Sequence, residues 1–293
     1  MYVFVNDEPF TERFKRHIRA ATKSKVEFGL VPKEQWEIPE WINRTKMQEY
    51  MEKLKRTPYG DSESYRKMCR YQSGFFMHHP LLDNYDYYWR IEPNVRYFCN
   101  LKLGKDPFRV MRDEKKKYGW VLSLLEFPQT VRTLWATTKN FVRDNPEIAN
   151  MNGNMIKFVS DTGGQKYNFC HFWSNFEIAD LHFMRSKEYT AYFNYLDQAG
   201  GFFYERWGDA PVHSIAVALF LDKSEVHYFD NIGYYHEPFT HCPAVKAGTC
   251  RCMPEDSMAY DAFGYSCLWR WDLVHGRDPK QMEEKLIDDA VAV

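Results

Sequence analysis

The sequence contains no apolar run approaching the roughly 20 residues that a membrane span requires. It also has almost no net charge: the formal value is −1, so no general attraction to nucleic acid or to an anionic membrane is expected. Internal repeats, low-complexity segments and evident linkers are absent as well. The chain opens on MYVFVNDEPF, which is typical of a strand rather than of a signal peptide. Taken literally, these absences predict a globular cytosolic protein.

Aromatic side chains are abundant. Of the 293 residues, 17% are Phe, Trp or Tyr and 44% are hydrophobic, which is ample for a packed core and argues against disorder. The length permits one large domain or two modest ones.

The cysteines do not fit a cytosolic protein. Four of them crowd the last 52 residues, which predicts either disulfides in an oxidising compartment or a metal site: Cys242, Cys250, Cys252 and Cys267. The Cys-x-Cys spacing is too tight for a common zinc knuckle, so disulfides are favoured. Because the chain has seven cysteines, one must remain unpaired. A glycosylation sequon at Asn43-Arg44-Thr45 agrees with a secretory compartment.

Hydrophobic periodicity predicts strands that alternate with helices, hence an α/β sheet covered on both faces. In open sheets of this kind, ligands bind at the carboxyl ends of the strands. Strands are expected within residues 1–6, 26–32, 85–95, 119–127, 168–181 and 225–239, and helices within 8–22, 44–56, 62–80, 130–144, 186–198 and 210–221.

The segment YDYYWRIEPNV, residues 85–95, reads as a buried strand that nevertheless carries charges. Alternation places Asp86, Tyr88, Arg90 and Glu92 on one face. Pro93 would end the pairing and leave Glu92 at the carboxyl end, where a carboxylate can hold a hard cation that in turn binds phosphate. The alternative is a water-facing carboxylate, or an ion pair between Asp86 and Arg90 that only orients a loop.

The segment NFCHFWSNFEIADL, residues 168–181, shows the same anomaly. Alternation predicts His171, Trp173, Asn175 and Glu177 on one face. An aromatic platform beside amide and carboxylate groups suits sugar recognition, and Glu177 could act as a nucleophile or base. The alternative is an exposed face of the sheet.

Two further segments carry candidate groups. In GGFFYERWGDAPVHS, Asp209 could cap a helix that begins near Ala210, while Glu205 and Arg206 could form a structural pair. In DNIGYYHEPF, His236 is expected on a loop, where it could join a carboxylate on manganese or be a structural residue.

With these segments in view, the chain strongly resembles the fungal Golgi α-1,2-mannosyltransferases, glycosyltransferase family 15. The resemblance spans nearly the whole chain, with weaker matches in NDEPFTERFK, GLVPKEQWEIPEWI and SYRKMCRYQSGFF. It is carried chiefly by YDYYWRIEPNV, YNFCHFWSNFEIADLHFMRS, AGGFFYERWGDAPVHSIA and HYFDNIGYYHEPFTHCP.

The resemblance implies a nucleotide-sugar (GT-A-like) α/β fold with a mixed central sheet flanked by helices. It implies one catalytic domain over residues 1–293, with a Cys-rich extension, residues 242–293, packed on it. The activity expected is retaining transfer of mannose from GDP-mannose, with Mn2+, to the 2-hydroxyl of a mannose-terminated N- or O-linked glycan. Relatives are Golgi type II membrane proteins, and this chain is expected to lack their anchor and first strand, because it begins at about the second strand.

The resemblance also assigns roles to residues. Glu92 matches an acidic metal ligand, and His236 matches the histidine that joins it. Glu177 corresponds to the carboxylate proposed as nucleophile, or serves as an electrostatic prop, and with Tyr65 and Asp209 it completes the expected catalytic set. The expected donor or acceptor contacts are Arg70, Asp86, Arg90, Trp173, Asn175, Glu205 and Arg206.

Two rival interpretations remain open at this point. One is a mannan-binding or scaffolding protein that kept an acceptor groove after losing donor chemistry. The other is a zinc-stabilised cytosolic protein whose Cys/His-rich tail is the functional part.

Overall fold

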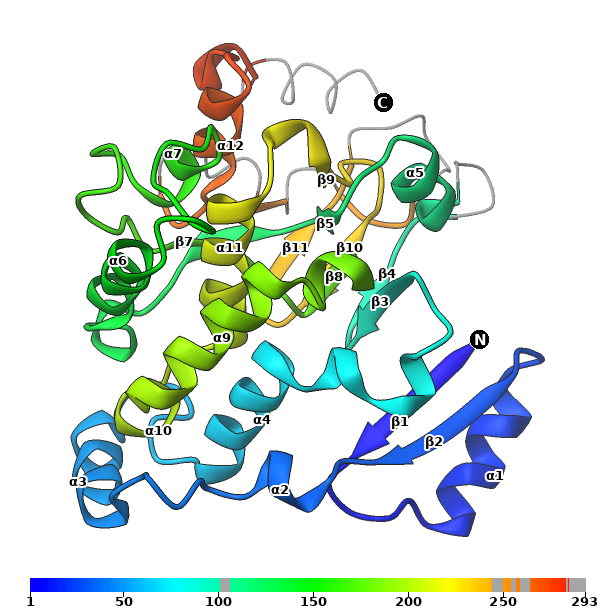
Figure 1. The fold of residues 1–293 in the computed structure, drawn as a ribbon. Helices are drawn as coiled ribbons and strands as arrows, with labels where there is room; N and C mark the ends of the chain where they lie inside the picture. Colours follow the sequence, from blue (N-terminus) through cyan, green and yellow to red (C-terminus); the bar gives the residue numbers. More distant parts are fainter. Residues whose placement is uncertain (101–105, 244–249, 254–256, 259–263, 283, 285–293) are drawn as a thin grey trace.

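A four-stranded mixed sheet forms the centre of the molecule (Figure 1). The computed structural model describes the chain except for residues 101–105, 244–249, 254–256, 259–263, 283 and 285–293. The strand order is β3 (Tyr87–Ile91), β8 (Phe176–Asp180), β5 (Tyr118–Trp120) and β9 (Val226–Tyr228). Strand β8 is antiparallel to β3 and β5, and β9 is parallel to β5. The carboxyl ends of β3, β5 and β9 therefore face the same edge, and the expected mixed α/β architecture is confirmed.

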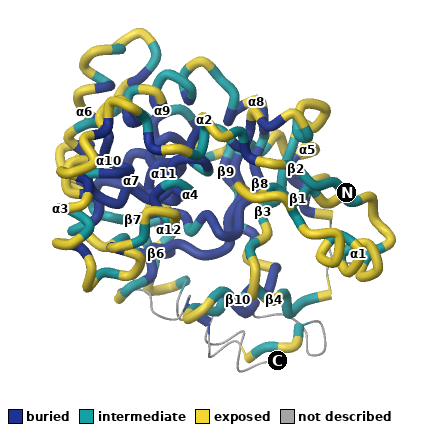
Figure 2. Tube along the Cα trace, turned by 90° about the horizontal axis from the view of Figure 1, so that it is seen from below, coloured by how far each residue is buried: buried dark blue, intermediate teal, exposed yellow. Residues whose placement is uncertain are grey.

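The helix α11 (Asp209–Phe220) lies in the middle of the core. Its sequence is apolar around almost its whole circumference, and every residue from 209 to 219 is buried. A helix that is hydrophobic on all sides must be covered by other elements. Helices α4 (Glu63–Gly74) and α9 (Lys187–Ala199) pack against it. The dark-blue tube in Figure 2 shows this buried centre.

Strand and helix signals predicted many of the other elements. Ser62 caps helix α4 at the start of the helix expected within residues 62–80: its hydroxyl accepts a hydrogen bond from the Tyr65 N–H at 3.1 Å. The helices not yet named are α1 (Glu12–Ala21), α2 (Lys33–Trp36), α3 (Arg44–Leu54), α5 (Pro107–Asp113), α6 (Leu134–Asp144), α7 (Ile156–Val159), α8 (Leu181–Met184), α10 (Gly201–Tyr204) and α12 (Leu268–Val274).

A parallel pair of strands, β1 (Tyr2–Asn6) and β2 (Val26–Leu30), lies at one side of the molecule with α1 as its crossover (Figure 1). Aromatic rings fill the space between the pair and the helix. These rings are Phe4, Phe10, Phe14 and Phe28, with centroids 5.0–6.4 Å apart.

Two segments expected to be single strands are each two strands, so those predictions are wrong in their continuity. Residues 119–127 contribute to β5 and to β6 (Ser123–Leu125), and residues 168–181 form β7 (Cys170–Phe172) and β8. A turn separates β7 from β8, in which the Phe176 N–H donates to the Trp173 carbonyl. Strand β7 then pairs with β6 rather than with the central sheet. The alternation predicted from His171 to Glu177 therefore does not hold across this turn.

A three-stranded antiparallel sheet lies beside the central one, in the order β11 (Phe239–His241), β10 (Tyr234–His236) and β4 (Arg96–Tyr97). The loop expected around His236 is wrong, because His236 is the last residue of β10. The peptide bond between Glu237 and Pro238, between the two hairpin strands, is cis.

The cysteines form three disulfides, Cys99–Cys250, Cys170–Cys267 and Cys242–Cys252. Cys69, buried in α4, is the unpaired seventh. The expectation of disulfides is confirmed, and the tail cysteines keep no thiolate for zinc. Two of the bonds tie the tail to the body of the protein. A packed C-terminal extension over residues 242–293 stays a prediction. Among the described residues, no helix has the length and hydrophobicity needed to span a membrane.

Candidate active site

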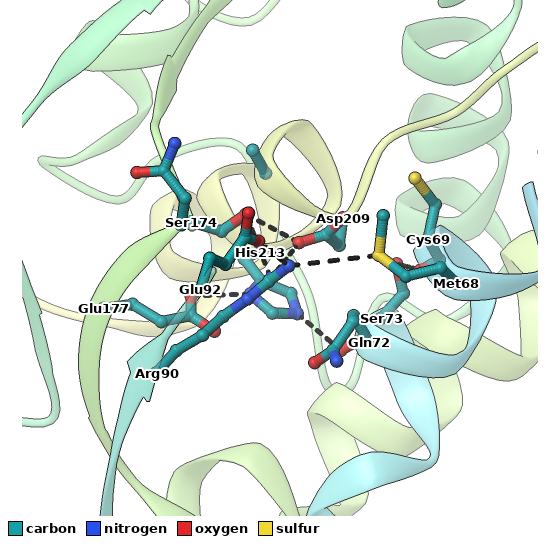
Figure 3. A network of polar contacts seen from close by, with 12 residues as sticks. Met68, Cys69, Gln72, Ser73, Arg90, Glu92, Ser174, Glu177, Asp209 and His213 are labelled. Carbon is teal, nitrogen blue, oxygen red and sulfur yellow. Dashed lines mark hydrogen bonds and ion pairs between the residues drawn. The ribbon is translucent and has the colours of Figure 1, made fainter. Parts of the chain in front are cut away.

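Arg90 is the charged residue within β3, and it has carboxylate partners on both sides. Its side chain is opposite Glu177 in the β3–β8 register. Its guanidinium donates one hydrogen bond to Asp209, at the start of α11, and another to Glu92, just beyond β3 (Figure 3). A buried guanidinium needs such carboxylate partners, because an unpaired buried charge is costly. Arg90 therefore joins the strand end to the first turn of a buried helix.

Asp209 is ionised in this setting. Burial by itself would raise the pKa of its carboxyl, but the charges of Arg90 and His213 and a hydrogen bond from Ser174 together lower it to about 2. The Ser174 hydroxyl donates to Asp209 at 2.6 Å. The capping role predicted as an alternative is wrong, because Gly208 is the N-cap residue and Asp209 is the first residue of the helix.

Glu92 and His236 lie together beyond the carboxyl end of β3. A Glu92 carboxylate oxygen is 3.4 Å from His236 Nε2, and each side chain is 28% exposed. Although burial opposes it, Arg90 and His236 lower the pKa of Glu92, and the hydrogen bond with Glu92 raises the pKa of His236. The ring of Trp173 meets that of His236 edge-on, with centroids 4.7 Å apart.

This pair fits a divalent cation of intermediate hardness. Two ligands bound at about 2.1 Å to one ion stand roughly 3 Å apart, close to the separation of Glu92 and His236. Carboxylate oxygen and imidazole nitrogen together suit Mn2+. Within the described residues, no group of three His, Cys, Asp or Glu side chains converges on one point. An ion held by this pair would complete its coordination with water and with oxygens of a ligand such as a diphosphate.

Glu177, which is opposite Arg90 on the neighbouring strand β8, is completely buried. One carboxylate oxygen accepts a hydrogen bond from the Tyr88 hydroxyl at 2.6 Å. The other accepts from the Tyr118 hydroxyl at 2.9 Å and lies 2.9 Å from His213 Nδ1. Both oxygens of Glu177 are thus occupied by side chains from three different elements, β3, β5 and α11.

A second charged cluster surrounds Arg206, which follows α10. An Arg206 nitrogen is 3.3 Å from a Glu126 carboxylate oxygen, and the guanidinium lies 5.3 Å from the centre of the Tyr65 ring. Tyr65 in turn stacks on Tyr59 at 4.5 Å, and Tyr59 is 61% exposed. Arg206 Nε and His171 Nδ1 are buried, and no described group hydrogen-bonds to them. This cluster presents an aromatic platform backed by a cation and a carboxylate.

Several residues expected at the site have structural partners elsewhere. Arg70 makes a bidentate pair with Asp197 of α9, with N···O distances of 2.7 and 2.9 Å. Glu205 accepts hydrogen bonds from Thr133 and from the Trp207 indole.

Asp86 and Asn175 also have partners outside the Glu92–His236 pair. Asp86 lies at the amino end of β3 with its side chain 77% exposed, 3.8 Å from His182. The Asn175 side chain accepts a hydrogen bond from the Tyr234 hydroxyl at 3.0 Å, which ties the β7–β8 turn to β10. Roles for these residues in donor or acceptor binding stay predictions.

Sequence reasoning missed Glu126 and His213. Glu126 ends the apolar run of β6, much as Glu92 follows β3, and that shared pattern could have identified it. His213 lies four residues after Asp209, so both project from one face of an otherwise apolar helix.

The mixed central sheet, with a carboxylate and an imidazole together at the end of its edge strand, defines a protein of the GT-A-like glycosyltransferase fold. The family model described as Glycolipid 2-alpha-mannosyltransferase matches residues 1–276, and the chain belongs to that family.

Curated relatives agree with this assignment. The chain is 51% identical over 276 residues to Alpha-1,2 mannosyltransferase KTR1 of Saccharomyces cerevisiae, covering 92% of this chain and 69% of that protein. It is 50% identical to Glycolipid 2-alpha-mannosyltransferase 2 of Candida albicans, covering 97% of this chain and 62% of the relative. The chain thus spans roughly two thirds of the length of these relatives.

Two solved structures share the fold. Core-mannan synthase A (CmsA/Ktr4) of Aspergillus fumigatus, in its Mn/GDP form, matches with a TM-score of 0.85 and 44% identity, over 94% of this chain and 76% of that chain. The mannosyltransferase Ktr4p of S. cerevisiae in complex with GDP matches with a TM-score of 0.86 and 41% identity, over 96% of this chain and 75% of that chain.

Proposed function

We propose that this chain is a retaining, Mn2+-dependent α-1,2-mannosyltransferase that moves mannose from GDP-mannose to the 2-hydroxyl of a mannose on N- or O-linked glycans. The observation that carries the proposal is the Glu92–His236 pair at the carboxyl end of β3. The family membership and the Mn/GDP form of a structural relative support it. The three disulfides and the fungal relatives support a site of action in the secretory pathway, in the Golgi lumen.

Glu92 and His236 would hold the cation, with Arg90 orienting the Glu92 carboxylate. The ion, when bound, neutralises charge that develops on the departing diphosphate. Arg90 is itself kept in place by Asp209, so Asp209 acts as a positioning residue in this scheme. Tyr65 and Tyr59 offer a flat surface on which a sugar can stack.

In this proposal Glu177 stabilises charge electrostatically and is not the nucleophile. A nucleophile must reach the anomeric carbon, but the Glu177 carboxylate is 0% exposed and holds hydrogen bonds from Tyr88 and Tyr118. Its negative charge can nevertheless stabilise positive charge on the reacting sugar through the low-dielectric interior. Retention would then follow from attack on the face that the nucleotide leaves.

The test is transfer of mannose from GDP-mannose to methyl α-mannoside, first with Mn2+ and then with a chelator. The proposal predicts turnover that depends on the metal. A folded sample that binds mannan but shows no turnover would instead support the mannan-binding protein that has lost donor chemistry.

A further inference from the structure

Four ionisable side chains form a compact array between the sheet and α11. Arg90 and Glu177 are opposite each other on β3 and β8. Asp209 and His213 are four residues apart on α11 and project from the same face. Asp209 bonds to Arg90, and His213 bonds to Glu177, as Figure 3 shows. If His213 is protonated, the signs of charge alternate around all four sides of the array.

The hydrogen bonds of His213 indicate that it carries two protons. Its Nε2 is 3.0 Å from the backbone carbonyl oxygen of Gln72, which can only accept, so Nε2 is a donor. Its Nδ1 is 2.9 Å from a Glu177 oxygen that already accepts from Tyr118. The Tyr88 and Tyr118 hydroxyls donate to the two Glu177 oxygens, so the carboxylate is the acceptor on both sides and Nδ1 is a donor as well. The imidazole is 1% exposed, and protein groups occupy both of its nitrogens.

The groups around His213 favour its charged form. Burial by itself would lower the pKa of His213, but the charge and hydrogen bond of Glu177, with the charge of Asp209, raise it, while Arg90 opposes them. The titratable and charged groups that face the ring are Tyr88 and Arg90 of β3, Tyr118 of β5, Glu177 of β8, Tyr189 of α9 and Asp209 of its own helix.

We propose that His213 is a positioning residue for the Glu92 site: its imidazolium holds the Glu177 carboxylate in an ion pair, so that Arg90 remains bonded to Asp209 and Glu92. Without that positive charge, the Glu177 carboxylate would compete for the guanidinium across the β3–β8 pair. Glu92 would then lose the donor that orients it toward His236. His213 thus acts on the metal-binding pair without touching it.

The protonation state can be measured directly on the wild-type protein. The 15N chemical shifts of the His213 ring, followed by NMR against pH, should show both nitrogens protonated at neutral pH. A ring with a single N–H at neutral pH would overturn the inference. This measurement needs neither metal nor nucleotide, so its outcome is independent of the proposed transferase function.

A rescue experiment tests the positioning role, which rests on the proposed function. His213→Gln should weaken Mn2+-dependent GDP binding in calorimetry by roughly five- to thirtyfold. Adding Glu177→Gln removes the uncompensated charge, and the double variant should return to within about threefold of the wild type. A double variant as weak as His213→Gln alone would show that the imidazole acts by packing, and would overturn the proposal.

His227→Gln is the matched control. His227 is a partly buried histidine on β9, at the opposite edge of the sheet from β3, with Glu114 4.0 Å away. Its replacement should leave GDP affinity unchanged. A wild-type protein that binds no GDP in the presence of Mn2+ would contradict the proposed function, while the NMR result would still decide the charge of His213.

Discussion

Asp209 shows how one residue can satisfy two different patterns. In the sequence GDAP, Asp209 could cap the helix, or its carboxylate could instead bind a side chain elsewhere in the fold. The structure selects the second, because Arg90 would otherwise be a buried cation held by Glu92 alone. Local sequence cannot decide this, since Arg90 lies 119 residues away. The choice depends on which distant side chain the fold brings to the helix start.

Replacing Asp209 with Asn should destabilise the protein by about 3 kcal/mol, because it leaves the Arg90 charge short of a buried partner. Ser174→Ala removes only one hydrogen bond to Asp209 and should cost about 1 kcal/mol. Urea denaturation of both variants measures the difference. Equal losses would mean that the ion pair adds nothing beyond the hydroxyl contact.

The lowered pKa of Asp209 predicts that the stability of the protein depends on pH. The pKa of Asp209 is lowered to about 2 in the folded state, below the ordinary value near 4. Its contribution is therefore fully present above pH 4 or so and is lost as pH falls toward 2. Unfolding free energy measured through this window should fall less steeply in Asp209→Asn than in the wild type. Identical slopes would contradict the lowered pKa.

At the scale of elements, the sequence predicted whether a segment is a helix or a strand better than where that element begins and ends. Helices α4 and α9 were predicted because their signals are local, with a serine cap as an additional signal for α4. The breaks between β5 and β6 and between β7 and β8 were not predicted. Both segments read as continuous strands rich in apolar and aromatic residues, and only the pairing of β7 with β6 separates these pieces from the central sheet. The Glu92–His236 pair was anticipated from the family resemblance, whereas spacing alone left it open.

Helix packing around α4 provides an element-scale prediction. A Cβ added at Gly74 would lie 2.2 Å from ring atoms of Phe193 on α9. Gly74→Ala should destabilise the protein by about 1–3 kcal/mol through overpacking, despite the better helix propensity of Ala. Ser64→Ala, at an exposed position of the same helix, is the control and should change stability little. Thermal unfolding compares the two, and a stabilised Gly74→Ala would show that α4 and α9 are not packed this closely.

At the scale of the whole molecule, disulfides join segments that are distant in sequence. Cys99–Cys250 spans 151 residues and Cys170–Cys267 spans 97, so both restrict the unfolded chain strongly. Composition predicted that such bonds exist, but their partners could not be deduced, because many pairings are compatible with one sequence.

Thiol titration under denaturing, non-reducing conditions tests this arrangement. The structure predicts one reactive thiol, from Cys69, before reduction and seven after it. Cys69→Ser should bring the first value to zero. Four or more free thiols before reduction would contradict the disulfides and return attention to a metal-bound tail.

The central claim is that Glu92 holds a divalent cation which in turn binds the diphosphate of GDP. Calorimetric titration of GDP in the presence of Mn2+ should show binding by the wild type and by Glu52→Gln, a surface control on α3. Glu92→Gln should lose at least about tenfold in Mn2+-dependent affinity while its circular dichroism stays unchanged. Unchanged GDP affinity in a folded Glu92→Gln protein would contradict the account.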